Sequence, residues 1–407
     1  MVKTRWLIFC VLFLVSCVLT GCKENVKDDF FIHTTKSETF SYDYNTYENG
    51  LIYVDQKNQA NFLEYSSMNG VPLCNKPNCK HNDSKCTSIL CMENNNPIVF
   101  KDNIYYFKSS NEIVDSEDGK SQTCKISSQC MRISLKTGEE EVFIEFNDVD
   151  PTASCSYVLN DGILYFISSY AANQFSDGTW SYSSGGGKQY LCSINLENKD
   201  FMNYGLVNDS PYAENNTIIT GSSMNSVSDQ VVLSGIYNNK IYMYYQYVKN
   251  QQDLIDVLSA NGDLNKDVPW IYENKSFDLK TGDIAVSDLP PAVVIQENMY
   301  AYWDNEVNCY VIKTEDGKDI IAKGFKETWS PRIVNGKLWS FANGIYNDSQ
   351  CFDIVSQKLY SITNETYTNE KAMTRMIDYV GRKYIVQYQS NQGTVFDEVL
   401  EKNLIGN

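Results

Sequence analysis

A short pattern of polar, apolar and aromatic positions recurs along the 407-residue chain. Each copy starts at an acidic or amide turn and continues into an alternating apolar and aromatic run. Asn-Gly and Asp-Gly pairs tolerate the positive φ angles of tight hairpin turns, and alternating β-branched and aromatic residues form half-buried strands. The pattern therefore predicts β-hairpins. The copies are ENGLIYV (48–54), KDNIYYF (101–107), NDGILYF (160–166), YNNKIYMYY (237–245), QENMYAYW (296–303), VNGKLWSF (334–341) and, more weakly, YVGRKYIVQY (379–388).

A second pattern, strand then polar turn then strand, follows most of these hairpins. Its copies are CMRISLKTGEE (130–140), LCSINLENKD (191–200), NKSFDLKTGDI (274–284), CYVIKTEDGKD (309–319) and CFDIVSQKLY (351–360). Units of about four short strands predict an all-β fold, a β-propeller. We expect seven blades of four antiparallel strands, with six or eight as alternatives. A tandem of β-sandwiches would not keep one hairpin signature throughout, and a β-solenoid would have shorter periods.

The propeller is expected to span residues 39–407 as a single domain, with a cysteine-rich loop at 72–91 between the first two units. The last unit is short of a strand. The N-terminal segment ETFSYDYNTY (38–47) is expected to supply that strand and to close the ring by pairing with the last blade.

The N-terminus has the pattern of a secretory signal. Two basic residues precede an uncharged apolar run at 6–19, which is shorter than the roughly 20 residues of a membrane span. The next residues complete Leu19-Thr20-Gly21-Cys22, which resembles a bacterial lipobox. The sequence thus predicts a lipoprotein signal peptide at 1–21, lipidation of Cys22 and a flexible polar tether at 22–38. An ordinary signal peptide with a chance cysteine is the alternative.

These features place the mature protein on the outer face of the cell membrane, held by its lipid anchor. The net charge is −17, and removal of residues 1–21, which hold two basic and no acidic residues, makes it −19. Such a surface repels phosphates, so nucleic acid is not an expected partner. We expect a monomer.

The cysteine-rich loop is the most distinctive chemical feature of the sequence. Cys74, Cys79, His81, Cys86 and Cys91 lie among proline, asparagine and aspartate residues that are typical of loops. Outside the cytoplasm, a disulfide staple is the favoured interpretation. A zinc site made by the first four of these residues is the rival, because three thiolates and an imidazole suit tetrahedral zinc. Free thiols are a third alternative. No other cofactor is expected.

The remaining cysteines follow the repeat. Cys130, Cys309 and Cys351 each lie three residues before an isoleucine in equivalent strands of different units. Equivalent positions in separate blades are too far apart for bridging, so these residues are interpreted as buried packing. Cys124, Cys155 and Cys192 show no pattern.

The lipobox, the repeated hairpins and the element PLCNKPNCKH with its following cysteine resemble lipoproteins of Gram-positive, Clostridia-type anaerobes. Those proteins carry a β-propeller domain of unknown function. The matching residues of the local element are Pro72, Leu73, Cys74, Pro77, Cys79, His81 and Cys86. The resemblance implies an extracytoplasmic, lipid-anchored propeller, and it implies no established activity.

Catalytic groups are scarce in the sequence. The chain has two histidines, His33 in the tether and His81 in the loop, which disfavours a Ser-His-Asp triad. We therefore expect a non-enzymatic binding or scaffold protein for a protein, a peptide or a cell-envelope glycan. The alternative is a carbohydrate-active hydrolase or lyase that uses carboxylates in the propeller channel. A third interpretation is a subunit of an envelope assembly or sensor complex.

Overall fold

A computed structural model describes residues 38–406 with internal gaps. Among the described residues, no helix is long and apolar enough to cross a membrane. The signal peptide, Cys22 and His33 lie outside the described residues. The gaps are 41–43, 48, 56–58, 75, 77, 83–85, 89–96, 116–121, 148, 152–153, 155, 170–188, 209–216, 221–222, 227–230, 249–251, 254–255, 258–259, 261–268, 291–293, 327–330, 341–349, 363–371, 391–392 and 401–403.

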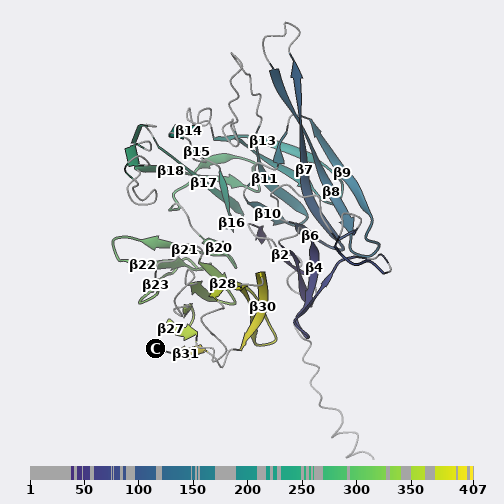
Figure 1. Cartoon of the computed structure of the whole chain (residues 1–407). Helices are drawn as coiled ribbons and strands as arrows, with labels where there is room; N and C mark the ends of the chain where they lie inside the picture. The colour runs from purple at the N-terminus through teal and green to yellow at the C-terminus, as the bar shows by residue number, and fades with distance from the viewer. Residues whose placement is uncertain are drawn as a thin grey trace, which may run out of the picture.

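Seven antiparallel sheets succeed one another along the chain and form the blades of a β-propeller, as the repeat predicts (Figure 1). Within each blade, every strand pairs with the next one in sequence. Blades 1 to 3 are β2 (Tyr44–Tyr47), β3 (Gly50–Val54), β4 (Ala60–Glu64), β5 (Asn69–Pro72); β6 (Ile98–Phe100), β7 (Asn103–Asp115), β8 (Gln122–Ser134), β9 (Glu140–Asn147); and β10 (Tyr157–Asn160), β11 (Ile163–Ser169), β12 (Gln189–Asn195), β13 (Phe201–Asn208).

The other four blades repeat this order. They are β16 (Val232–Tyr237), β17 (Lys240–Val248), β18 (Trp270–Asp278), β19 (Ile284–Val286); β20 (Val294–Gln296), β21 (Met299–Asp304), β22 (Cys309–Lys313), β23 (Asp319–Ala322); β24 (Arg332–Val334), β25 (Lys337–Ser340), β26 (Gln350–Asp353), β27 (Lys358–Ile362); and β28 (Ala372–Val380), β29 (Lys383–Ser390), β30 (Gly393–Leu400). A separate hairpin, β14 (Thr217–Thr220) with β15 (Ser223–Ser226), lies between blades 3 and 4 in sequence.

The tight turns between the first and second strands have the predicted geometry. In blades 3 to 7, both central residues of the two-residue turn have positive φ angles, as at Asp161-Gly162 and Asn335-Gly336. Two successive positive φ angles define a type I′ turn, whose twist matches that of the strands it joins. The amide, acidic and glycine pairs read from the sequence therefore fix the register of these hairpins.

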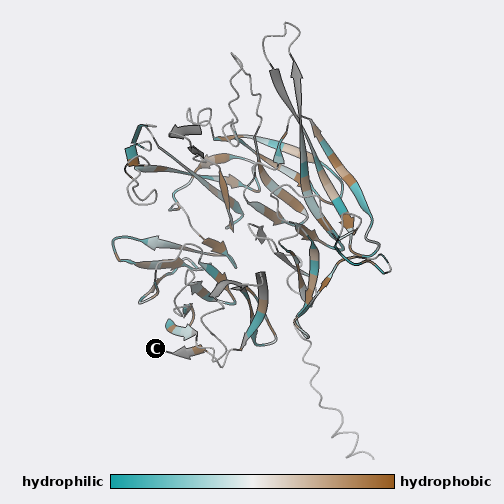
Figure 2. Ribbon diagram, viewed as in Figure 1, coloured by the Kyte–Doolittle hydropathy of each residue, from teal (hydrophilic) through white to brown (hydrophobic). Residues whose placement is uncertain are grey.

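The core is divided among the junctions between blades. Figure 2 shows most of the hydrophobic colour along the strands. Seven described clusters of buried residues each join two neighbouring blades, and each large buried side chain contributes about 1.5–3 kcal/mol. In order around the ring, the clusters include Ile52 with Ile104, Phe107 with Phe166, Tyr165 with Phe277, Tyr237 with Tyr300, Ile312 with Ile333, Trp339 with Tyr384, and Leu51 with Ile385.

The last of these clusters closes the ring between blade 7 and blade 1, where Figure 1 shows the yellow C-terminal blade facing the purple N-terminal one. The Tyr65 hydroxyl donates to Asp378 Oδ2 at 2.9 Å, and the rings of Tyr53 and Phe396 lie 4.7 Å apart edge to face. Side-chain packing, rather than a shared sheet, therefore joins the two ends of the propeller.

The expected closure of the last blade by the N-terminal segment is wrong. Residues Tyr44–Tyr47 form β2, the first strand of blade 1, because that blade needs its own fourth strand. The preceding strand β1 (Glu38–Phe40) pairs with β10, the first strand of blade 3. At the other end, β31 (Leu404–Gly406) pairs with β27 of blade 6, and the described sheet of blade 7 keeps three strands.

Candidate metal centre

The cysteine-rich loop leaves blade 1 directly after β5 and returns to the same blade before β6 begins. The Leu73 amide donates to the Ala60 carbonyl at 2.9 Å, and the Ala60 amide donates to the Ser88 carbonyl at 2.7 Å. One residue of β4 therefore holds both ends of the segment 73–88 through its two backbone groups. This arrangement makes the intervening residues a compact, anchored loop.

Four side chains of this loop converge, and we call them the loop cluster: Cys74, Cys79, His81 and Cys86. Their ligand atoms, three sulfurs and a ring nitrogen, all lie within 4.8 Å of one another. The His81 Nδ1 atom lies 3.4 Å from Cys86 Sγ. Cys86 is 3% exposed, whereas the other three are half-buried.

The disulfide staple favoured by the sequence is not formed. Cys74, Cys79 and Cys86 are free thiols in the structure, and Cys91 lies outside the described residues. The physical reason is the geometry of the cluster, in which the His81 imidazole lies among the three sulfurs. A disulfide joins two sulfurs at about 2.05 Å and gives no role to a third sulfur or to a ring nitrogen.

Gln59 lies beneath the cluster and is 7% exposed. Its Nε2 group donates to the His81 carbonyl at 3.2 Å and to Ser88 Oγ at 3.0 Å, and it lies 3.9 Å from Cys86 Sγ. The Gln59 backbone is held in turn, because its amide donates to Asp55 Oδ1 at 3.0 Å. A buried side chain with this many partners fixes the position of the loop relative to β4.

Two hydroxyl groups contact the sulfurs. Thr87 Oγ1 donates to Cys74 Sγ at 3.3 Å, and Ser88 Oγ lies 2.9 Å from Cys86 Sγ. Burial raises the pKa of both thiols, but the hydroxyl of Thr87 and neighbouring backbone donors outweigh it at Cys74, so that its pKa is lowered. At Cys86 the hydroxyl and amide of Ser88 have the same net effect.

The pKa of Cys79 shifts in the opposite direction. A backbone donor at His81 favours its thiolate, but burial and the two neighbouring cysteines together raise its pKa. Three thiols this close cannot all ionise without a compensating positive charge. The cluster therefore has a net tendency to attract a cation.

The backbone of the loop is held in an uncommon conformation. Asn78 and His81 have φ angles of 57° and 53°, in the left-handed region that non-glycine residues rarely occupy. Asparagine tolerates this region better than histidine does. Such conformations persist where the surrounding structure holds them, and they gather at ligand-binding sites.

A groove of about 200 Å³ opens beside Cys74 and Thr87. Its other side is formed by blade 2, through Ile104 of β7 and the turn after β8 that includes Gly138. Leu73 packs against the apolar cluster between blades 1 and 2. The loop thus covers the outer part of that junction.

The blade cysteines lie in a different environment. Cys130, Cys309 and Cys351 occupy the third strands of blades 2, 5 and 6, as predicted from their alignment. Cys130 and Cys351 are fully buried and Cys309 is half-buried. Cys192, in the third strand of blade 3, is also fully buried. The alignment missed it because it precedes Ile194 by two residues, not three.

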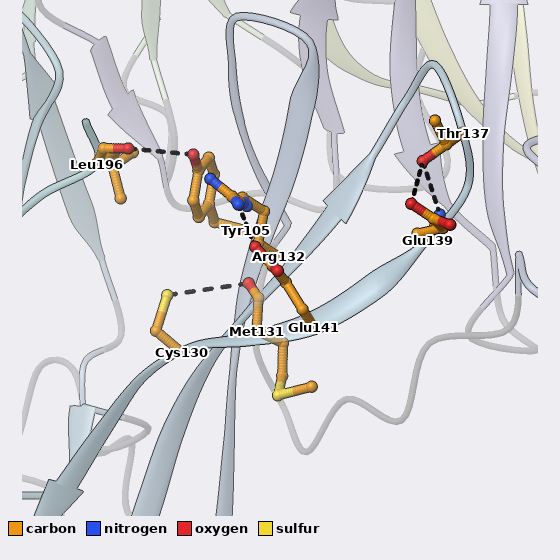
Figure 3. Close-up of polar contacts among 8 residues, drawn as sticks. All are labelled: Tyr105, Cys130, Met131, Arg132, Thr137, Glu139, Glu141 and Leu196. Atoms are coloured by element: carbon orange, nitrogen blue, oxygen red, sulfur yellow. Dashed lines mark hydrogen bonds and ion pairs between the residues drawn. The ribbon is translucent and has the colours of Figure 1, made fainter. Parts of the chain in front are cut away.

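Figure 3 shows the neighbourhood of Cys130 on β8. Its sulfur has one weak contact, 3.9 Å to the Met131 carbonyl, and burial raises its pKa. Nearby, the Tyr105 hydroxyl donates to the Leu196 carbonyl of the next blade at 3.2 Å, and Arg132 pairs with Glu141. These contacts join strands and blades, and they gather no ligand atoms around the sulfur.

The fold and the loop cluster define the class of this protein: a seven-bladed β-propeller with a cysteine- and histidine-bearing loop between its first two blades. No family model and no curated protein sequence matches the chain. Solved structures of similar shape include an oligogalacturonate lyase from Vibrio parahaemolyticus, at 8% identity and a TM-score of 0.44 over 91% of this chain and 98% of that one.

Two further solved structures are an acylaminoacyl peptidase from Pyrococcus horikoshii and TolB from Acinetobacter baumannii. The peptidase has 11% identity and a TM-score of 0.43 over 93% of this chain and 53% of that one. TolB has 8% identity and a TM-score of 0.30 over 86% of this chain and 63% of that one. These likenesses concern the fold and carry no argument about activity.

Proposed function

We propose that this chain is a lipid-anchored, extracytoplasmic β-propeller that binds a protein, a peptide or a cell-envelope glycan and does not catalyse a reaction. The lipobox ending at Cys22 supports the anchor, and the propeller fold supports a rigid binding scaffold. Seven packed junctions give the ring a fixed shape, which lowers the entropic cost of binding a partner.

The observation that carries this proposal is the ring of seven packed blade junctions, and the carboxyl groups of the described residues agree with it. Asp102, Asp278, Asp316 and Asp353 have displaced pKa values, and all four are lowered. Lys136 and Tyr47 lower the pKa of Asp102, and Lys318 and Thr314 lower that of Asp316 to about 2. A glycosidase-type general acid needs the opposite displacement. These carboxylates hold turns and ion pairs together.

The pKa of Asp353 is also lowered, although this carboxyl group is more buried than the other three. Burial raises its pKa, but the hydrogen bond from Lys337 Nζ, at 2.8 Å, and donors from Ser356 outweigh that effect. A carboxylate fixed to a lysine between two strands is a structural anion. Its lowered pKa does not suit a general acid, which must hold a proton to donate.

The location is tested with the full chain expressed in a Gram-positive host and its Cys22→Ala variant. The wild-type chain should fractionate with membranes and carry the mass of an acylated cysteine, and the variant should lose both properties. The same result for the two chains would overturn the anchor.

The binding role is tested with purified cell-envelope glycan and with crosslinking on intact cells. The full chain should be retained by the glycan or should crosslink to one envelope protein, and it should leave glycan chains uncut. Hydrolase or lyase activity that disappears when carboxylates near the propeller axis are replaced would show an enzyme and overturn the proposal.

A further inference from the structure

We propose that the loop cluster binds one metal ion of the zinc type in a closed tetrahedral site that locks the loop onto blade 1. The cluster is Cys74, Cys79, His81 and Cys86, as defined above. This inference is independent of the proposed binding role, because it concerns what holds the loop and not what the propeller recognises.

The first argument is geometry. Zinc lies about 2.3 Å from sulfur and about 2.0–2.1 Å from an imidazole nitrogen, so the edges of its ligand tetrahedron are about 3.5–3.8 Å. The His81 Nδ1 to Cys86 Sγ distance, 3.4 Å, is close to such an edge. All other ligand pairs lie within 4.8 Å. Side-chain rotations that move the ligand atoms by about 1 Å would therefore complete the tetrahedron.

The second argument is the chemistry of the donor set. Thiolates and imidazole are soft to borderline ligands that favour zinc over calcium or magnesium, which take oxygen ligands. Four protein ligands fill a tetrahedral shell and leave no position for substrate or water. Closed sites of this composition are structural, whereas catalytic zinc keeps an open position.

The third argument is the shell around the ligands. Metal-bound cysteines and histidines are held by hydrogen bonds from a second layer of residues. Here Thr87 donates to Cys74 Sγ at 3.3 Å, and Ser88 Oγ contacts Cys86 Sγ at 2.9 Å. Gln59 reaches the His81 carbonyl and lies close to Cys86 Sγ. A disulfide would need none of these groups.

The expected consequence is local order. A bound ion joins positions 74 and 86 across a loop that Ala60 already anchors at both ends. The ion would therefore fix the wall of the groove beside Cys74, which faces blade 2. Binding also displaces whatever protons the three thiols still hold, so that affinity falls with falling pH.

The test uses the full chain, reduced and freed of metal under an inert atmosphere, and titrated with Co²⁺. We expect stoichiometric binding, with the intense visible bands of tetrahedral cobalt and a thiolate-to-cobalt charge-transfer band, both removed by Zn²⁺. Cys79→Ser should lose part of the charge-transfer intensity, because two of the three thiolates remain, and should bind more weakly. Cys309→Ser, a half-buried thiol in β22, is the matched control and should behave as wild type.

Thermal unfolding provides a second measurement that holds even if a variant is less stable. Zn²⁺ should raise the unfolding temperature of wild type and of Cys309→Ser, and at the same concentration should raise that of Cys79→Ser and His81→Ala by less. Three results would overturn the proposal: no cobalt binding by the reduced chain, a weak octahedral spectrum, or equal loss of the signal in Cys309→Ser.

Discussion

Cys86 in the loop and Cys192 in blade 3 are both almost inaccessible to solvent, at 3% and 0% exposure. Their pKa values nonetheless move in opposite directions. Burial alone acts on Cys192 and raises its pKa to about 12, whereas the hydroxyl and amide of Ser88 reverse the effect of burial at Cys86. The donors around a sulfur, together with its depth below the protein surface, separate a thiol that packs from a thiol that can bind a cation.

The two settings follow from their secondary structure. In a strand, the backbone donors next to Cys192 are used in pairing with β11 and β13, where its cross-strand neighbours are Phe166 and Asn203. In the loop, backbone donors at Lys76, Thr87 and Ser88 and the hydroxyls of the last two face the sulfurs of Cys74 and Cys86. The irregular loop backbone, held at both ends by Ala60, thus supplies hydrogen-bond donors to sulfur that a blade strand does not.

The largest expected difference between the two settings is in alkylation. At pH 8, a thiol with a pKa of about 12, such as Cys192 or Cys351, is ionised to about 10⁻⁴, against about 0.2 for an ordinary cysteine. In the folded chain with a chelator present, Cys74 and Cys86 should react with iodoacetamide on the order of 10³ times faster. Peptide mass spectrometry over time measures the rates.

The pH dependence sharpens this test. Between pH 8 and pH 10 the thiolate fraction of Cys192 and Cys351 rises about tenfold per unit, because their raised pKa lies above this range. The thiolate fraction of Cys74 and Cys86 rises less steeply, because their pKa values are lowered. In denaturant all cysteines should react alike, which is the control. Equal rates in the folded chain would show that the blades open faster than alkylation occurs.

The next effect is on stability. Cys130→Ser places a hydroxyl in a fully buried site whose one described contact is 3.9 Å long, and the desolvation of that group should cost about 1–3 kcal/mol. Cys309→Ser, at a half-buried site, should change stability by less than about 0.5 kcal/mol. Midpoints of urea unfolding compare the two variants. An equal loss in both would mean that the blade position, not burial, decides the cost.

The propeller could be read from the sequence because its signal is repeated. Turns of acidic, amide and glycine residues, each followed by an apolar and aromatic run, specify a hairpin, and seven copies specify seven sheets. The ring closure could not be predicted, because the sequence of 38–47 favours strands and does not say which sheet edge they join. Its division into β1 on blade 3 and β2 in blade 1 depends on which edges remain open after folding.

The loop cluster was predictable in its members and not in its chemistry. The spacing of its three cysteines and one histidine marked them as a group, but three outcomes shared that spacing: a disulfide bridge, a metal site or free thiols. What distinguishes them is tertiary: Gln59 and Ser88 lie beside the sulfurs because β4 runs beneath the loop. No sequence pattern ties Gln59 to His81, which are 22 positions apart.

Gln59 offers a test confined to the loop. Gln59→Leu keeps the volume and removes the donors to the His81 carbonyl and Ser88 Oγ, which should cost about 1–2 kcal/mol. The amides of Ala60 and Leu73 should then exchange with deuterium about tenfold faster, while those of blade 3 stay unchanged. Gln129→Leu, which removes one exposed bond to Glu145, is the control. Faster exchange throughout the chain would contradict a local role.

The smallest expected effect concerns the left-handed turn at Asn78, whose φ angle is 57°. In this region, a residue that has a Cβ but no side-chain amide is less stable by about 1 kcal/mol. Glycine has no such penalty, because it lacks a Cβ. Asn78→Ala should therefore weaken the loop by about 1 kcal/mol, and Asn78→Gly should stay within about 0.5 kcal/mol of wild type. Limited proteolysis of the segment 73–88 measures both. Since the Cys79 amide donates to the Lys76 carbonyl across this turn at 3.3 Å, a turn that relaxed to ordinary φ angles would move the Cys79 sulfur away from the other ligands. Equal cleavage of the alanine and glycine variants would show that the conformation of Asn78 does not hold the cluster together.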